Sequence, residues 1–333
     1  MRTHRLDCLR GTGLALSSLL LLALARPGLA QVDEGFSAQN FQPPIDSFGY
    51  VTMNGARHLR AGHPFAAAYV DWSNNPLDLR DINEGFIDRM TFVHGVASIG
   101  VVNFLENGGI SLGAVVQYAA EMDGIGRDPG TTDPAFVTPP AVELPDGRLA
   151  DTRVETKITF LDREKDPIGI ALRGWGVIPT GEDKYFLSND EHFGGGGGLI
   201  LEKDFGGFRI GAEGAYEWIE GDVVISEVEF VDTGIPGISE GTESEKLRID
   251  DKLHMKLGVA KELFVDDFWF VVEATHWARA LHVYNTTRES PAEIGAALRF
   301  DRHVLILVGA SAGVNDGVGA PDVRGFASLG FRF

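Results

Sequence analysis

Apolar and polar residues alternate one by one along most of the chain after residue 48. In Thr152–Leu161, Val154 and Ile158 fall on one face of an extended chain, whereas Arg153 and Lys157 fall on the other. The same alternation recurs in residues 208–218, 252–260 and 293–300. This period of two predicts strands that each have one apolar and one polar face.

The lengths of these segments favour a membrane barrel over a soluble sandwich. Most of them run for about ten to twelve residues, close to the length that crosses a bilayer at a tilt, whereas sandwich strands are shorter. Short polar turns also alternate with long connections, which is typical of an outer-membrane barrel with short periplasmic turns. We therefore expect an all-β, transmembrane, antiparallel up-and-down β-barrel with apolar residues outward and polar residues in the lumen.

The number of strands follows from the direction of each segment. Thirteen segments are visible, at about 48–59, 64–72, 89–103, 109–122, 151–161, 167–179, 194–203, 207–218, 249–260, 267–278, 291–300, 303–314 and 323–333. The order of short turns and long connections makes the segment at 48–59 run toward the periplasm. A chain that starts in the periplasm therefore needs one earlier strand that runs outward, and residues 35–42 are the candidate. The main prediction is about 14 strands, an even number. The alternative is 12 strands, with residues 31–63 partly inside the barrel as a plug.

The last strand carries an additional signal. Leu329, Phe331 and Phe333 lie on one face, and Arg324 and Arg332 lie on the other. An amphipathic final strand that ends in Phe resembles the signal read by the outer-membrane assembly machinery. The resemblance implies that machinery as a partner and Leu329, Phe331 and Phe333 as the assembly signal.

The first 30 residues read as a cleaved signal peptide. Arg2, Arg5 and Arg10 form a positive region, and residues 14–25 form an apolar run that is too short for a comfortable membrane span. Small residues precede a cleavage point before Gln31. We therefore expect residues 31–333 to form a single barrel domain in the cell outer membrane.

Composition limits the partners. The chain has a formal charge of −19, and its only cysteine is Cys8. Such negative charge argues against nucleic acid as a partner. The expected barrel in the outer membrane instead implies outer-membrane lipid, lipopolysaccharide and small solutes as partners. Residues 217–251 are rich in acids, but no spacing matches a calcium loop. We expect no metal or cofactor there, and interpret this stretch as a solvated outer loop whose alternating residues 223–231 form a hairpin.

Both signs of charge occupy the polar faces of the predicted strands, and these residues are the candidates for lining the lumen. They are Arg153, Glu155, Lys157, Arg173, Arg209, Glu213, Lys252, His254, Lys256, Glu273, Arg299 and Arg324. Two interpretations remain open. The charges line a porin-like pore for small solutes, or they pair across a narrow barrel and fill it. An enzyme is not expected, because no spacing of Ser, His and acid is distinctive and no Cys nucleophile follows residue 30.

Short motifs near the start of the predicted barrel suggest a family. Residues 41–44 (FQPP), 49–51 (GYV) and 69–77 (YVDWSNNPL) resemble the barrel of OmpA-family proteins of myxobacteria and related deltaproteobacteria. The resemblance implies a barrel followed by a peptidoglycan-binding domain, but this sequence stops at the barrel, so peptidoglycan anchoring is not expected. Two alternatives to porin-like passage follow. One is a structural or adhesive OmpA-like protein. The other is a hydrophobic-compound channel of the fatty-acid-transporter type, which the short segment before residue 48 disfavours.

Overall fold

We describe the chain from a computed structural model. It describes residues 39–78, 86–104, 107–126, 142–144, 146–181, 187–188, 193–219, 223–235, 238–249, 251–264, 266–280, 290–315 and 317–333. The expected signal peptide, residues 1–30, lies outside the described residues. No helix in these ranges is long and apolar enough to cross a membrane.

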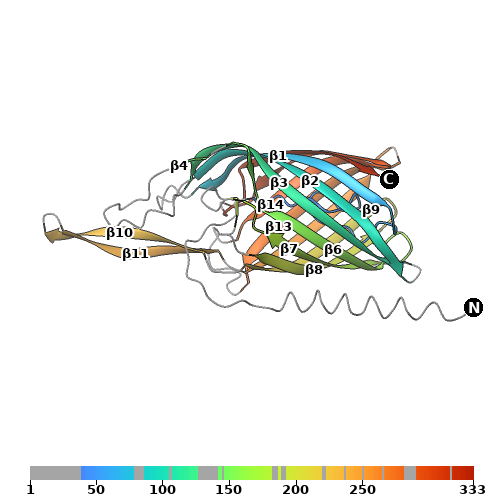
Figure 1. Cartoon of the computed structure of the whole chain (residues 1–333), viewed down its shortest axis with the longest axis horizontal. Coiled ribbons are helices and arrows are strands. Elements are labelled where there is room, and N and C mark those ends of the chain that lie inside the picture. Colours follow the sequence, from blue (N-terminus) through green and yellow to red (C-terminus); the bar gives the residue numbers. More distant parts are fainter. Residues whose placement is uncertain are drawn as a thin grey trace, which may run out of the picture. The chain divides into compact units, whose positions relative to one another are not determined.

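Twelve antiparallel strands form a closed barrel (Figure 1). They are β1 (Pro64–Asp78), β2 (Phe86–Phe104), β3 (Gly108–Gly126), β6 (Thr152–Leu161), β7 (Gly169–Ile178), β8 (Gly194–Asp204), β9 (Phe208–Ile219), β12 (Lys252–Glu262), β13 (Phe268–Arg279), β14 (Ala292–Asp301), β15 (Val304–Gly313) and β16 (Val323–Arg332).

The first and last of these strands close the barrel. β1 pairs with β2 on one side and with β16 on the other, in a register that runs from Phe65 opposite Arg332 to Asn74 opposite Val323. The main-chain N–H of Phe333 donates to the carbonyl of Pro64 over 3.1 Å. Closure removes the two sheet edges, so the main-chain groups of these strands have partners within the barrel.

The outer face of the barrel is apolar and the inner face is polar, as the alternation predicts. On β12, Met255, Leu257 and Val259 are 41%, 62% and 42% exposed, whereas His254 and Lys256, which alternate with them, are buried. The same arrangement occurs on β6, where Val154 is exposed and Arg153 is buried. A soluble sandwich would show the reverse, so the burial pattern is that of a barrel in lipid.

The prediction of 14 strands is wrong, and the alternative of 12 is confirmed. Residues 39–63 contain no strand, so the strands expected at 48–59 and, for its described part, at 35–42 do not form. Residues 39–59 instead run through the interior, with side chains such as Ile45, Met53 and Asn54 fully buried. We call residues 39–59 the plug. Its apolar residues imitate a strand pattern because they contact the wall, not because they face lipid.

Four shorter or separate strands accompany the barrel. β10 (Val223–Ile235) and β11 (Ile238–Ile249) pair with each other as an antiparallel hairpin, so the hairpin expected in the acid-rich stretch is confirmed. β4 (Val142–Glu143) and β5 (Arg148–Leu149) each pair with the second half of β3. These elements lie in the long connections, where the sequence predicts no barrel strand.

Candidate functional site

The interior of the barrel is occupied by the plug, which makes it the candidate functional site. One side of the plug is apolar. Phe41, Phe48, Val51 and other plug residues pack with buried wall residues in one hydrophobic cluster. The wall members are Phe65, Tyr69, Val96, Val115, Ala260, Val271, Ala297, Leu305, Leu307 and Phe326. These inward apolar residues explain why parts of β1, β2 and β15 carry apolar side chains on both faces.

The main-chain carbonyls of the plug bind basic side chains of the wall. Arg153 donates to the carbonyl of Pro43 over 2.6 Å, and Lys157 donates to that of Gly55 over 2.9 Å. Lys256 donates to the carbonyl of Thr52 over 3.0 Å. Arg299 makes a longer bond of 3.4 Å to the carbonyl of Tyr50. Four basic residues on three strands, β6, β12 and β14, therefore hold the plug through its main chain.

Acidic side chains of the wall bind the main-chain N–H groups of the plug. The Glu273 carboxylate accepts from Val51, Thr52 and Met53 over 2.8, 3.0 and 3.1 Å, and also from the Thr52 hydroxyl. Glu202 accepts from Ala56 over 2.9 Å. Hydrogen bonds to a charged partner are stronger than neutral ones, so these contacts contribute strongly to the position of the plug.

Small wall residues make room for the plug. A Cβ added at Gly258 would lie 2.5 Å from the Tyr50 ring, and one at Gly211 would lie 2.7 Å from the Tyr50 hydroxyl oxygen. A Cβ at Gly169 would lie 2.7 Å from the Cβ of Ala56. The inner wall therefore fits the plug in shape and also binds it through charged side chains.

The other inward charges pair with one another. Arg173 lies 3.2 Å from the Glu155 carboxylate and 2.7 Å from that of Glu213. Arg324 lies 2.6 Å from Asp71 and 3.1 Å from Glu293. These pairs are buried, and breaking one by removing a single partner leaves an uncompensated charge.

The structure places the predicted lumen candidates on the inner wall. Eleven of the twelve are at most 6% exposed, and Lys252, near the start of β12, is partly exposed. Six of them contact the plug: Arg153, Lys157, Lys256, Glu273, Arg299 and, through the side chain of Asn54, Glu155. Arg324 pairs with Asp71 in the wall and also donates to the side chain of Gln39 in the plug. Arg173 and Glu213 pair within the wall. His254 lies beside Glu217, with its Nε2 3.5 Å from the carboxylate.

Inward residues that the sequence analysis missed include Asp71, His94 and Glu202. Asp71 and His94 are fully buried and lie 2.6 Å apart, and Glu202 is 2% exposed. Asp71 alternates with Val70 and Trp72, which are 43% and 40% exposed on the outer face. The period of two therefore could have found Asp71, because an acid between two lipid-facing residues must point inward.

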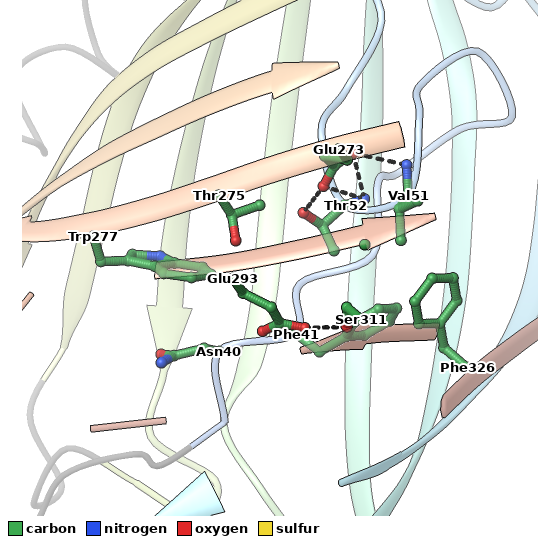
Figure 2. Close-up of a pocket in the computed structure, with 11 residues that line it drawn as sticks. Asn40, Phe41, Val51, Thr52, Glu273, Thr275, Trp277, Glu293, Ser311 and Phe326 are labelled. Carbon is green, nitrogen blue, oxygen red and sulfur yellow. Dashed lines mark hydrogen bonds between the residues drawn. The ribbon is translucent and has the colours of Figure 1, made fainter. Parts of the chain in front are cut away.

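A small cavity lies between the plug and strands β13–β16 (Figure 2). It has about 20 Å³ open to the centres of water molecules, enough for a water molecule or so. Plug residues Phe41 and Thr52 line it, together with Glu273, Trp277 and Glu293 of the wall. In the described residues, the plug and paired charges thus fill the interior that an open pore would require.

Comparison with solved structures confirms the fold. The chain matches the crystal structure of an outer membrane channel from Pseudomonas putida F1 with a TM-score of 0.53 and 10% identity, over 84% of this chain and 98% of that one. The NanC porin and the KdgM porin match with TM-scores of 0.41 and 0.40, at 11% and 8% identity. They cover 82% and 80% of this chain and 99% of each porin.

No family model matches the chain, and no curated relative matches it. The match to the Pseudomonas putida channel, at 10% identity, shows a shared fold. The chain is therefore a closed, antiparallel barrel of twelve strands with the fold of an outer-membrane β-barrel.

Proposed function

We propose that this protein is an outer-membrane channel for small polar solutes, closed in this structure by the plug. The apolar outer face supports a position in the outer membrane, reached with a cleaved signal peptide and in contact with lipid and lipopolysaccharide. The fold shared with an outer membrane channel is consistent with passage through the lumen. Leu329, Phe331 and Phe333, which are exposed on the outer face of β16, are the proposed assembly signal.

The observation that carries this proposal is how the plug is held. Residues 39–59 form no strand pairing with the wall. Their main-chain groups bind wall side chains instead, including Glu273 and Lys256. The plug can therefore leave without breaking any pairing between barrel strands.

The proposed solute is polar rather than apolar. The short segment before residue 48 does not argue against the fatty-acid-transporter alternative, because the first barrel strand begins only at Pro64. The wall itself supplies a better reason. Removing the plug would expose Arg153, Lys157, Lys256 and Glu273, which contact its main chain. Charged groups in the path are costly for an apolar solute to desolvate.

A disulfide that locks the plug tests the proposal. A Cβ added at Gly113 on β3 would lie 3.0 Å from the Cβ of Ile45 in the plug, about half an ångström below the usual disulfide range. Cys8, the only natural cysteine, lies in the proposed signal peptide, so the mature Ile45→Cys/Gly113→Cys variant would hold only the engineered pair. We expect openings in planar bilayers to vanish when the pair is oxidised and to return on reduction.

The two single-cysteine variants are the controls, and they should conduct identically in oxidant and reductant. Conductance that is unchanged by oxidation of the pair would show that the plug does not close the path. No conductance in any form would support the structural or adhesive alternative, which the filled interior also favours. That outcome would remove the channel proposal altogether.

A further inference from the structure

Thr52 of the plug is held at both ends of its main chain by two oppositely charged wall residues. Its N–H donates to Glu273 over 3.0 Å, and its carbonyl accepts from Lys256 over 3.0 Å. We infer that Glu273 and Lys256 form a recognition site for zwitterionic α-amino-acid units, as free amino acids or short peptides, which Thr52 occupies in the closed state. This inference rests on the proposed channel function and names its solute class.

The two side chains are placed by neighbouring strands. Glu273 on β13 lies opposite Gly258 on β12, and Lys256 lies two residues from Gly258, opposite Thr275. Residues two apart in a strand point to the same face, so Lys256 and Glu273 project into the same part of the lumen. They are 2% and 4% exposed. The pair is therefore a buried feature of the wall, set at the spacing of one amino-acid residue.

Glu273 and Lys256 carry charges that the uncharged main chain of the plug does not neutralise. Two buried charges here bind uncharged amide groups, and burying a charge is costly unless an opposite charge compensates it. A free α-ammonium group would bring a positive charge to Glu273, and an α-carboxylate would bring a negative charge to Lys256. A simple anion or cation would neutralise only one of the two charges, and an uncharged solute would neutralise neither.

Space for the rest of the solute lies beside the pair. The cavity between the plug and β13–β16 is lined by Thr52 and Glu273, and continues past Thr275 to Trp277 and Glu293 (Figure 2). Arg299 on the adjacent strand β14 reaches the carbonyl of Tyr50 over 3.4 Å, two residues before Thr52. The wall thus contacts more than one residue of a bound chain, which suits a short peptide as well as an amino acid.

Displacement of the plug gives a direct readout. Met53 is fully buried next to Thr52, so a Met53→Cys variant should react slowly with a maleimide in detergent-solubilised protein. Diglycine is the zwitterionic probe, and N-acetylglycinamide is its uncharged main-chain control. We expect diglycine to accelerate labelling by roughly tenfold and N-acetylglycinamide to leave the rate unchanged, since the difference is at least one charge-assisted hydrogen bond.

Variants of the pair identify the site. Glu273→Gln and Lys256→Gln, each in the Met53→Cys background, should raise the resting rate but abolish the acceleration by diglycine. Asp123→Asn removes a carboxylate that pairs with Arg89 and is more than half exposed, and should preserve the acceleration. Equal acceleration by both probes, by neither, or by diglycine in all variants would overturn the inference.

The inference and the channel proposal can fail separately. Liposome swelling reports passage, whereas maleimide labelling reports binding at the plug. Swelling in neutral solutes without acceleration by diglycine would reject the zwitterion site and leave the channel. Acceleration by diglycine without swelling in any solute would retain the site and reject the channel. If either variant fails to assemble, the comparison of the two probes on the Met53→Cys protein still decides the inference.

Discussion

The Tyr50 ring of the plug lies directly against Gly258 of β12, where a Cβ would come within 2.5 Å of the ring. On the neighbouring strand β9, Gly211 leaves the corresponding space for the Tyr50 hydroxyl and the methyl group of Met53. Two adjacent strands thus have glycine at the positions where a side chain would clash with the plug. The fit couples the wall to the plug without any hydrogen bond between their main chains at this point.

Replacing Gly258 by valine should therefore displace the plug. Overpacking a fitted site costs about 1–3 kcal/mol. A cost of that size on the closed state alone multiplies the population of the open state by roughly 5 to 150. We expect Gly258→Val to raise the open probability in planar bilayers by a factor in this range.

The control for this variant is Gly214→Val on β9. A Cβ at Gly214 would meet no atom within 4 Å, because this residue is on the outer face. Its open probability should match that of the unaltered protein. Equal open probabilities for Gly258→Val and Gly214→Val would show that the Tyr50 contact does not hold the plug.

The buried ion pair between Lys157 and Asp46 predicts a strong coupling. Both side chains are fully buried, and Asp46 belongs to the plug. Asp46→Asn or Lys157→Met alone leaves one uncompensated charge, a situation that costs about 3–5 kcal/mol. The double variant removes both charges and should be markedly more stable than the two single effects together predict. Guanidinium unfolding of the four proteins measures this cycle, and additive effects would rule the pair out as a coupled unit.

His58 predicts a dependence of stability on pH. It is 8% exposed and lies 3.6 Å from Asp162 in the turn after β6, outside the strands. Burial lowers the pKa of His58 below its ordinary value, an effect that the opposite influence of Asp162 only partly offsets. The unfolded chain therefore takes up this proton first as the pH falls through about 6.5. The free energy of unfolding should be unaffected by His58 above that pH and should decrease below it.

A His58→Gln variant isolates this contribution. Denaturation midpoints measured between about pH 8 and pH 5 should decline less steeply for the variant than for the unaltered protein, since about 6.5 is the unperturbed pKa of histidine. Identical slopes would mean that His58 titrates equally in the folded and unfolded states.

The end of β16 predicts a defect in assembly rather than in folding. Phe333 is 69% exposed on the outer face, in line with Leu329 and Phe331. Phe333→Ala should lower the amount of barrel in the outer membrane several-fold, whereas refolding into detergent micelles should be unchanged. Phe264→Ala is the control, because Phe264 is also fully exposed but lies in the turn between β12 and β13. Equal loss in both variants would indicate a general effect of exposed aromatic residues.

The barrel strands were largely predictable from the sequence. The strand expected at residues 151–161 is β6 at Thr152–Leu161, and the one expected at 194–203 is β8 at Gly194–Asp204. Prediction works here because lipid on one side and charged groups on the other impose a strict period of two. The same constraint fixed the inward orientation of Arg153, Lys157 and Glu273.

The sequence indicated the plug only as part of the 12-strand alternative, and the reason is physical. Residues 48–59 place apolar side chains at irregular spacing, with glycine at 49 and 55, and this pattern is compatible with a poor strand. Inside a barrel a segment meets wall on all sides, so its apolar residues follow the local shape of the wall and no fixed period. Contacts such as that between Glu273 and Val51, which are 222 residues apart, leave no signal in a single sequence.

The position of the plug in the chain also sets the order of events during folding. Thr52 is made long before its partners on β12 and β13, which follow more than 200 residues later. The plug therefore cannot find its contacts until most of the wall exists, and pairings of such long sequence separation form slowly. The segment that is translated before every barrel strand is among the last parts to become ordered. A nascent barrel would thus pass through a hollow intermediate whose charged interior is still hydrated.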